Sequence, residues 1–139
     1  MRRLLPLLIL LIVWGCKSES YEYIKSTYED GLPQLVQMYK SEDKNVLLKE
    51  IHYYPGQKKK MEGSFKNDLR DGTWSYWYAN GNLWSRGEYV AGLEKGIKTV
   101  WHENGQKYYE GYSDNGDRSG IWKFWDENGN LSKEINYDE

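Results

Sequence analysis

Residues 72–83 read GTWSYWYANGNL, and two related segments follow at residues 96–107 and 120–131. Each segment opens with a glycine, carries a tryptophan five residues later and ends near the dipeptide Asn-Gly, and each of these features returns after 24 residues. A fixed period of about 20–50 residues is typical of repeat proteins, in which each repeat is one small supersecondary unit. The sequence therefore predicts a chain built from one unit used several times.

Further positions share this period, and weaker copies precede residue 72. Residues spaced by 24 include Gly72, Gly96 and Gly120; Tyr53, Trp77, Trp101 and Trp125; Gly63, Gly87 and Gly111; and Trp74 and Trp122, with Lys98 between them. Upstream, a spacing of 25 or 26 residues implies small insertions. We count about five units, with degenerate units over residues 21–71 and clear units over residues 72–95, 96–119 and 120–139.

Each unit is predicted to be a β-hairpin. Asn-Gly between two aromatic-rich runs is a strong hairpin signal, because a two-residue type I′ turn needs positive φ at both central residues. The predicted turns are Asn80-Gly81, Asn104-Gly105 and Asn128-Gly129. The links between hairpins, at residues 66–71, 90–95 and 113–119, are rich in turn-forming residues and too short for helices. We therefore predict an all-β fold, an antiparallel meander of about ten strands.

The turn register also predicts which side chains oppose each other. With a two-residue turn at residues 80–81, Trp77 faces Trp84 and Trp74 faces Gly87. A large ring can cover the bare backbone of a glycine, so we expect the Trp74 ring to lie over Gly87. In the last unit the same register pairs Trp122 with Ile135 and Lys123 with Glu134.

One segment also fits a helix. The apolar residues of segment 32–39 share one helical face. Pro33, the preceding Asp30-Gly31 and the repeat register favour a strand instead.

The first fifteen residues have the features of a signal peptide. Arg2 and Arg3 precede an apolar run over residues 4–13, which is too short to span a bilayer. The run ends in Val13-Trp14-Gly15-Cys16, which resembles a bacterial lipobox. The resemblance implies a lipoprotein signal peptide over residues 1–15, lipid attachment at Cys16 and a short linker over residues 16–20 before the repeat domain at residues 21–139. The alternative is a free cysteine in an ordinary secreted protein.

These features predict a location. Two or more acyl chains anchor a protein stably to a membrane, so we expect a lipid-anchored protein of the bacterial cell envelope. An aspartate directly after the cysteine would resemble an inner-membrane retention signal. Lys17 stands there instead, and the absence of that signal favours the outer membrane.

Composition excludes several classes of protein. The chain has 139 residues, which is the size of one domain, and its 13 Tyr and 7 Trp are too many for a disordered chain. The mean hydropathy of −0.89 excludes a polytopic membrane protein. The formal charge of −2 gives no electrostatic signal for nucleic acid binding. The single cysteine excludes an intrachain disulfide and a cysteine-based zinc site.

The residue inventory predicts no catalytic residue, metal or cofactor. His52 and His102 replace aromatic residues of the repeat, so we interpret both as sheet residues. The carboxylates are scattered in turns, where aspartate usually closes an Asx-turn. Residues 114–117 resemble the start of a calcium loop but lack its twelve-position pattern and terminal glutamate.

The aromatic residues are the remaining functional signal. Strand alternation predicts Trp74, Tyr76 and Tyr78 on one face of the sheet, and Trp77 with Trp84 on the other. An exposed aromatic patch would mark a binding surface. Its candidate residues are Trp77, Trp84, Trp101, Trp125 and Tyr108. The alternative is that these rings are covered by twist and by long polar side chains.

The repeat resembles a known family. Segments 72–83, 101–107 and 120–131 resemble the MORN-repeat variant of bacterial YwqK-family antitoxin-like proteins, over residues 46–139 closely and 20–45 loosely. The resemblance implies a non-catalytic module that binds another protein at the envelope, with a toxin or an envelope protein as partner. A second hypothesis is an envelope-structural or glycan-binding lipoprotein that uses its aromatic faces on the cell wall.

Overall fold

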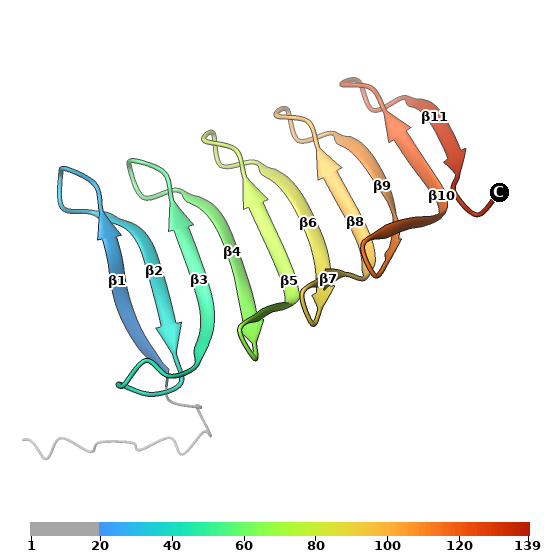
Figure 1. Cartoon of the computed structure of the whole chain (residues 1–139). Coiled ribbons are helices and arrows are strands. Elements are labelled where there is room, and N and C mark those ends of the chain that lie inside the picture. The colour runs from blue at the N-terminus through green and yellow to red at the C-terminus, as the bar shows by residue number, and fades with distance from the viewer. Residues whose placement is uncertain (1–19) are drawn as a thin grey trace, which may run out of the picture.

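The computed structural model describes residues 20–139 as a single antiparallel sheet (Figure 1). The sequence order of the strands is also their order in the sheet, except that the short β7 pairs only with β6. The strands are β1 Tyr21–Thr27, β2 Pro33–Tyr39, β3 Leu47–Tyr53, β4 Lys59–Lys66, β5 Leu69–Trp77, β6 Leu83–Val90, β7 Leu93–Glu94, β8 Gly96–Trp101, β9 Lys107–Asp114, β10 Asp117–Trp125 and β11 Leu131–Asn136.

This architecture confirms the predicted all-β meander of hairpins. Five hairpins follow one another: β1–β2, β3–β4, β5–β6, β8–β9 and β10–β11. Segment 33–39 is a strand, as its proline and its register predicted. The predicted signal peptide and Cys16 lie outside the described residues.

The Asn-Gly turns differ from the prediction. Among residues 20–139, Gly81 has positive φ but Asn80 does not, so the predicted type I′ turn is wrong. Instead, Gly81 N–H donates to the Tyr78 carbonyl and Tyr78 N–H donates to the Asn82 carbonyl. This is a three-residue loop in which only the glycine needs the left-handed conformation. The Asn80 side chain accepts from Asn82 N–H at 2.8 Å, which closes the loop as an Asx-turn.

Two-residue turns with positive φ at both positions occur at the opposite end of the sheet. They lie in the links, at Asn67-Asp68, Ala91-Gly92 and Asn115-Gly116. Each joins paired strands with no further residue between them. Type I′ turns therefore lie in the links from the second hairpin onward, whereas residues 40–46 join the first hairpin to the second, and the longer tip loops close each hairpin.

The predicted register is confirmed away from the hairpin tips. Trp74 pairs with Gly87, as expected. At the tip, however, Trp77 pairs with Leu83, which leaves Trp84 unpaired as a β-bulge. The predicted Trp77–Trp84 pair is therefore wrong, because the three-residue loop shifts the register by one and the bulge restores it. The last hairpin confirms the other predicted pairs, Trp122 with Ile135 and Lys123 with Glu134.

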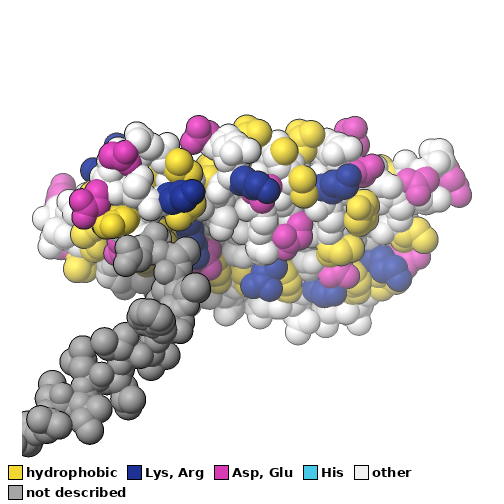
Figure 2. All heavy atoms as spheres, turned by 90° about the horizontal axis from the view of Figure 1, so that it is seen from below, with side chains coloured by type: hydrophobic (Ala, Val, Ile, Leu, Met, Phe, Trp, Pro, Cys, Tyr) yellow, Lys and Arg dark blue, Asp and Glu magenta, His cyan; other side chains and the backbone are white. Residues whose placement is uncertain are grey.

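The two faces of the sheet differ in character. One face, which we call the aromatic face, carries Trp74, Tyr76 and Trp122, and the two tryptophans are almost fully buried. The other, the polar face, carries cross-strand ion pairs such as Lys49–Glu62 at 3.0 Å. Charges of both signs also mix with hydrophobic side chains on the side shown in Figure 2.

The Trp74 ring covers a different glycine from the one predicted. A Cβ on Gly63 would lie 2.1 Å from the Trp74 ring, so the ring lies flat on the backbone of β4. A Cβ on Gly87 would meet Lys98 first, at 3.1 Å. The ring leans toward β4 because its indole N–H donates to the Ser64 carbonyl at 3.1 Å.

Side-chain hydrogen bonds join successive hairpins near their tips. The Tyr78 hydroxyl donates to the Trp101 carbonyl of the next hairpin at 2.8 Å. His102 repeats this contact, with its Nε2 atom 3.0 Å from the Trp125 carbonyl oxygen. The earlier hairpins make the same contact through Tyr28 to Tyr53 and through Tyr54 to Trp77. These bonds hold neighbouring tips at a constant offset.

Candidate functional site

The fourth hairpin departs from the repeat pattern on the aromatic face. Lys98 lies where the neighbouring hairpins carry Trp74 and Trp122, and Val100 lies where the third hairpin carries Tyr76. Both positions hold a narrower side chain in place of a large ring. The aromatic face is therefore hollowed over β8.

This hollow is a groove of about 790 Å³ between the third and fourth hairpins. Val100, Ser85 and Lys98 come from its central strands, β6 and β8. The aromatic residues that line it come from both hairpins and are Tyr76, Tyr78, Trp84, Tyr89, Trp101, His102, Tyr108 and Tyr109. We call this feature the aromatic groove.

Two rings reach the groove because each lies at a β-bulge. Trp84 and Tyr108 are the unpaired residues between the tip register and the inner register of their hairpins. A bulge re-aims its side chain, and the Trp84 ring lies 5.9 Å from the Tyr76 ring, centroid to centroid. The Tyr108 ring lies 4.7 Å from His102. Trp84 is therefore on the face opposite to the one predicted, and both bulge residues are 45% exposed.

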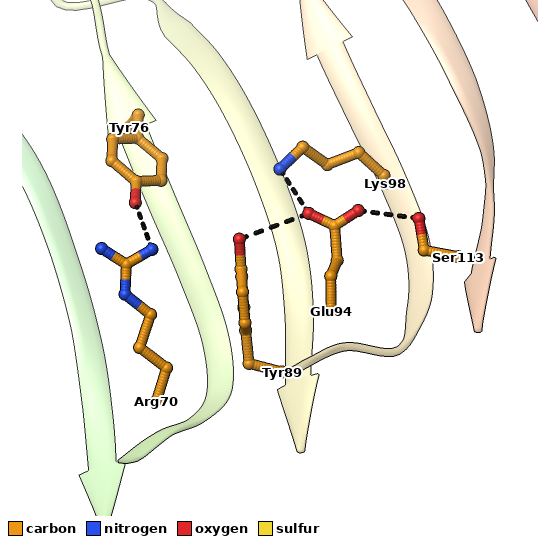
Figure 3. A network of polar contacts seen from close by, with 6 residues as sticks. All are labelled: Arg70, Tyr76, Tyr89, Glu94, Lys98 and Ser113. Atoms are coloured by element: carbon orange, nitrogen blue, oxygen red, sulfur yellow. Dashed lines mark hydrogen bonds and ion pairs between the residues drawn. The ribbon is translucent and has the colours of Figure 1, made fainter. Parts of the chain in front are cut away.

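A polar cluster lies at the link end of the groove (Figure 3). The Glu94 carboxylate accepts from Lys98 Nζ at 2.8 Å, from Ser113 Oγ at 2.8 Å and from the Tyr89 hydroxyl at 3.3 Å. Burial raises the pKa of Glu94, but the hydrogen bonds from Lys98 and Ser113 outweigh it and hold the pKa below its ordinary value. Burial lowers the pKa of Lys98, and the bond to Glu94 outweighs it, so this pKa is raised. Both groups are thus charged near neutral pH.

The flanking hairpins carry arginine in the register of Glu94. The Arg70 guanidinium lies 4.1 Å from the centroid of the Trp74 ring and donates to the Tyr76 hydroxyl at 3.1 Å. Arg118 lies 4.5 Å from the Trp122 ring in the fifth hairpin. The fourth hairpin thus replaces a stacked cation–π pair with an ion pair, which takes less room on the aromatic face.

The predicted binding residues do not all lie at one site. Trp84, Trp101 and Tyr108 line the aromatic groove. Trp77 lines a neighbouring hollow of about 340 Å³ between the second and third hairpins. Trp125 lines neither hollow, and Lys107 Nζ lies 5.4 Å from its ring centroid.

The predicted turn residues have a structural role at the tips. Asn80 Nδ2 donates to the Glu103 carbonyl at 3.1 Å, and Asn104 Nδ2 donates to the Glu127 carbonyl at 2.8 Å. Each bond joins one tip to the next. The asparagines therefore order the row of hairpins and do not line the groove.

Several groove residues were not among the predicted binding residues. They are Tyr76, Tyr78, Ser85, Tyr89, Lys98, Val100, His102 and Tyr109. The available signal was the break in the tryptophan register at Lys98, since a missing ring in an aromatic repeat leaves space. Among residues 20–139 the structure has no group of three or more His, Cys, Asp or Glu placed to hold a metal ion. Over the same range it has no helix long and apolar enough to cross a membrane.

Residues 70–91 and 118–139 match the model of the MORN repeat variant. These two segments are therefore similar to that repeat. The two matched segments are the third and fifth hairpins, and MORN repeats usually take part in protein or membrane interaction. No curated protein sequence matches the chain. The hairpin between the two MORN matches is the one that carries Lys98 and Val100, so the groove lies between a matched hairpin and one that departs from the pattern.

Proposed function

We propose that this chain is a non-catalytic, lipid-anchored repeat module that binds another protein at the bacterial cell envelope. The observation that carries the proposal is the aromatic groove. Tyr and Trp are enriched among residues that dominate the energy of protein interfaces. Here such rings line a hollow on the aromatic face, and Trp84 and Tyr108 remain 45% exposed.

The finer parts of the proposal come from the sequence. The lipobox at residues 13–16 supports a lipid at Cys16, and Lys17 supports a place at the outer membrane. The resemblance to YwqK-family antitoxin-like proteins supports a toxin or an envelope protein as the partner. The residue inventory supports a role without catalysis.

The first experiment compares capture of a partner by three forms of the full-length chain. A double variant, Lys98→Trp with Glu94→Arg, restores the repeat pattern of Trp74 and Arg70 and fills the groove without removing an aromatic residue. A variant with Tyr112→Ala changes an exposed ring on the polar face and serves as the control. We expect the filled-groove variant to lose binding by about 30-fold or more, as loss of an interface hot spot does, and the control to bind as the parent chain does.

Equal capture by all three forms would show that the groove is not the binding surface. The place of the chain is tested separately, by fractionating cells that express the parent chain or Cys16→Ser. We expect the parent in the outer-membrane fraction and the variant in the soluble periplasmic fraction. The same distribution for both would contradict the lipid anchor.

A second candidate function is binding of cell-wall glycan. The exposed rings of Trp84 and Tyr108 favour it, since aromatic faces also stack on sugar rings. Co-sedimentation with purified cell wall, lost in the filled-groove variant, would support glycan binding in place of protein binding.

A further inference from the structure

The hairpin tips present a periodic row of hollows on the aromatic face. Neighbouring strands lie about 4.7–4.9 Å apart, so equivalent residues of successive hairpins lie about 9.4–9.8 Å apart along the sheet. Hollows of about 270, 340 and 790 Å³ lie between the first and second, second and third, and third and fourth hairpins. We call these three hollows the tip slots.

Each wall between tip slots is built from the same two repeat positions. One is the residue directly before the three-residue tip loop, and the other is the bulge residue after the loop. The second hairpin supplies Tyr54 and Lys60, with Lys60 Nζ 5.6 Å from the centroid of the ring. The third supplies Tyr78 and Trp84, with centroids 6.1 Å apart. The row is therefore a structural repeat, although its three hollows differ in size.

An extended ligand across the strands must match this spacing on one of its own faces. A polyproline II helix has three residues per turn and rises about 3.1 Å per residue, so every third residue returns to the same face after about 9.3 Å. From the first slot to the third, its two turns cover about 18.6 Å, and the sheet covers about 18.8–19.6 Å. A β-strand also covers about 10 Å in three residues, but its third residue points to the opposite face. An α-helix advances about 6.4 residues in 9.6 Å, which is less than two full turns.

The chemistry of the row suits the same ligand. Polyproline II segments dock in grooves lined by aromatic rings, and their carbonyls have no internal hydrogen bonds. Within residues 20–139 the Trp74 and Trp122 indole N–H groups donate to backbone carbonyls, whereas that of Trp84 has no protein acceptor. Trp84 can therefore donate to a ligand carbonyl.

Charge also selects the ligand. Over β2 to β11, the strand residues of the aromatic face carry more cations than anions: Lys60, Arg70, Lys98, Arg118 and Lys133 against Glu50 and Glu94. Lys60 lines the first and second slots, and Lys98 lines the third. Lys98 is paired with Glu94, so a carboxylate between the apolar ligand residues would complement the Lys60 ammonium group.

We propose that the tip slots bind a polyproline II segment of a partner protein, with proline or another apolar residue at every third position and a carboxylate beside them. This inference rests on the proposed function, because it specifies the partner of the same surface. It assigns one turn of the ligand to each hairpin. It also gives Tyr54 and Lys60, outside the aromatic groove, a part in recognition.

The test uses the full-length chain and three synthetic peptides of equal length. The first peptide carries proline at every third position with glutamate between. The second has the same composition, but its prolines are spaced alternately by two and by four residues. The third has the proline spacing of the first, with lysine in place of glutamate. Binding is measured by calorimetry, with the Trp84 indole N–H followed by NMR. We expect the first peptide to bind at least about 10-fold more tightly than the other two and to shift the Trp84 signal.

Two variants of the chain make the test specific. Lys60→Glu should lower the affinity of the chain for the glutamate peptide and raise its affinity for the lysine peptide. Tyr112→Ala on the polar face should change neither affinity. Equal affinity of the first two peptides, or no binding of either, would overturn the polyproline II assignment. If a captured partner is nevertheless lost with the filled-groove variant, the proposed function stands and only the ligand conformation is wrong. Binding of cell-wall glycan fragments without binding of the peptides would overturn both.

Discussion

The placement of the Trp74 ring over Gly63 predicts that alanine is much more destabilising at Gly63 than at Gly87, although the two glycines share one repeat position. Replacing Gly63 by alanine puts a Cβ atom 2.1 Å from a ring carbon, whereas ordinary contact begins at 3.4 Å. The ring must therefore move by about 1.3 Å, the difference between these distances. Trp74 is only 1% exposed and lies 5.2 Å from the Phe65 ring, so it has little room to move.

The magnitude follows from three contributions. Overpacking a buried site costs about 1–3 kcal/mol. Displacement of the ring also weakens the hydrogen bond from its indole N–H to the Ser64 carbonyl, which contributes about 0.5–1.5 kcal/mol. Alanine restricts the unfolded chain more than glycine does, which returns about 0.4–1 kcal/mol. We expect Gly63→Ala to lower the free energy of unfolding by about 2 kcal/mol.

Gly87→Ala is the matched control, because its Cβ meets the flexible Lys98 side chain at 3.1 Å. We expect a change within about 0.5 kcal/mol. The free energy of unfolding is measured by urea denaturation of the full-length chain, followed by far-ultraviolet circular dichroism. Gly111→Ala repeats the test on Trp122, whose ring would lie 2.2 Å from the new Cβ. A loss at Gly87 as large as that at Gly63 would refute the placement of the rings.

Two further predictions concern polar contacts. The lowered pKa of Glu94 contributes stability that is fully present above the ordinary pKa of 4.5 and is lost as the pH falls through the lowered pKa. The raised pKa of Lys98 contributes stability that is fully present below the ordinary pKa of 10.5 and is lost as the pH rises through the raised pKa. The difference in unfolding free energy between the parent chain and the double variant Glu94→Gln/Lys98→Met should therefore be constant between pH 4.5 and 10.5 and should change outside this window. A difference that varies across neutral pH would contradict the ion pair. Tyr78→Phe removes the hydroxyl that donates to the Trp101 carbonyl, so it should lower the free energy of unfolding by about 0.5–1.5 kcal/mol in the same urea assay. Tyr112→Phe on the polar face should leave this free energy unchanged. Equal effects of the two variants would argue against the bond between hairpin tips.

The sequence alone determined the parts of the fold that depend on local contacts. The 24-residue period, the hairpin units and the meander order all follow from residues close along the chain, because each strand pairs with the next. The inner register of Trp74 with Gly87 was also predictable. It survived an error in the turn type because the tip loop and the bulge shift the register in opposite directions.

Only the tertiary structure decided the candidate site. Asn-Gly is compatible with both a two-residue and a three-residue loop, and the choice between them decides whether Trp84 is paired or becomes a bulge that joins Tyr76 on the aromatic face. The strand register also does not determine toward which neighbouring strand the Trp74 ring leans, because Trp74 pairs with Gly63 on one side and with Gly87 on the other. The groove depends on these choices in two adjacent hairpins at once, so its shape follows from packing between units, whereas the repeat itself is determined within each unit.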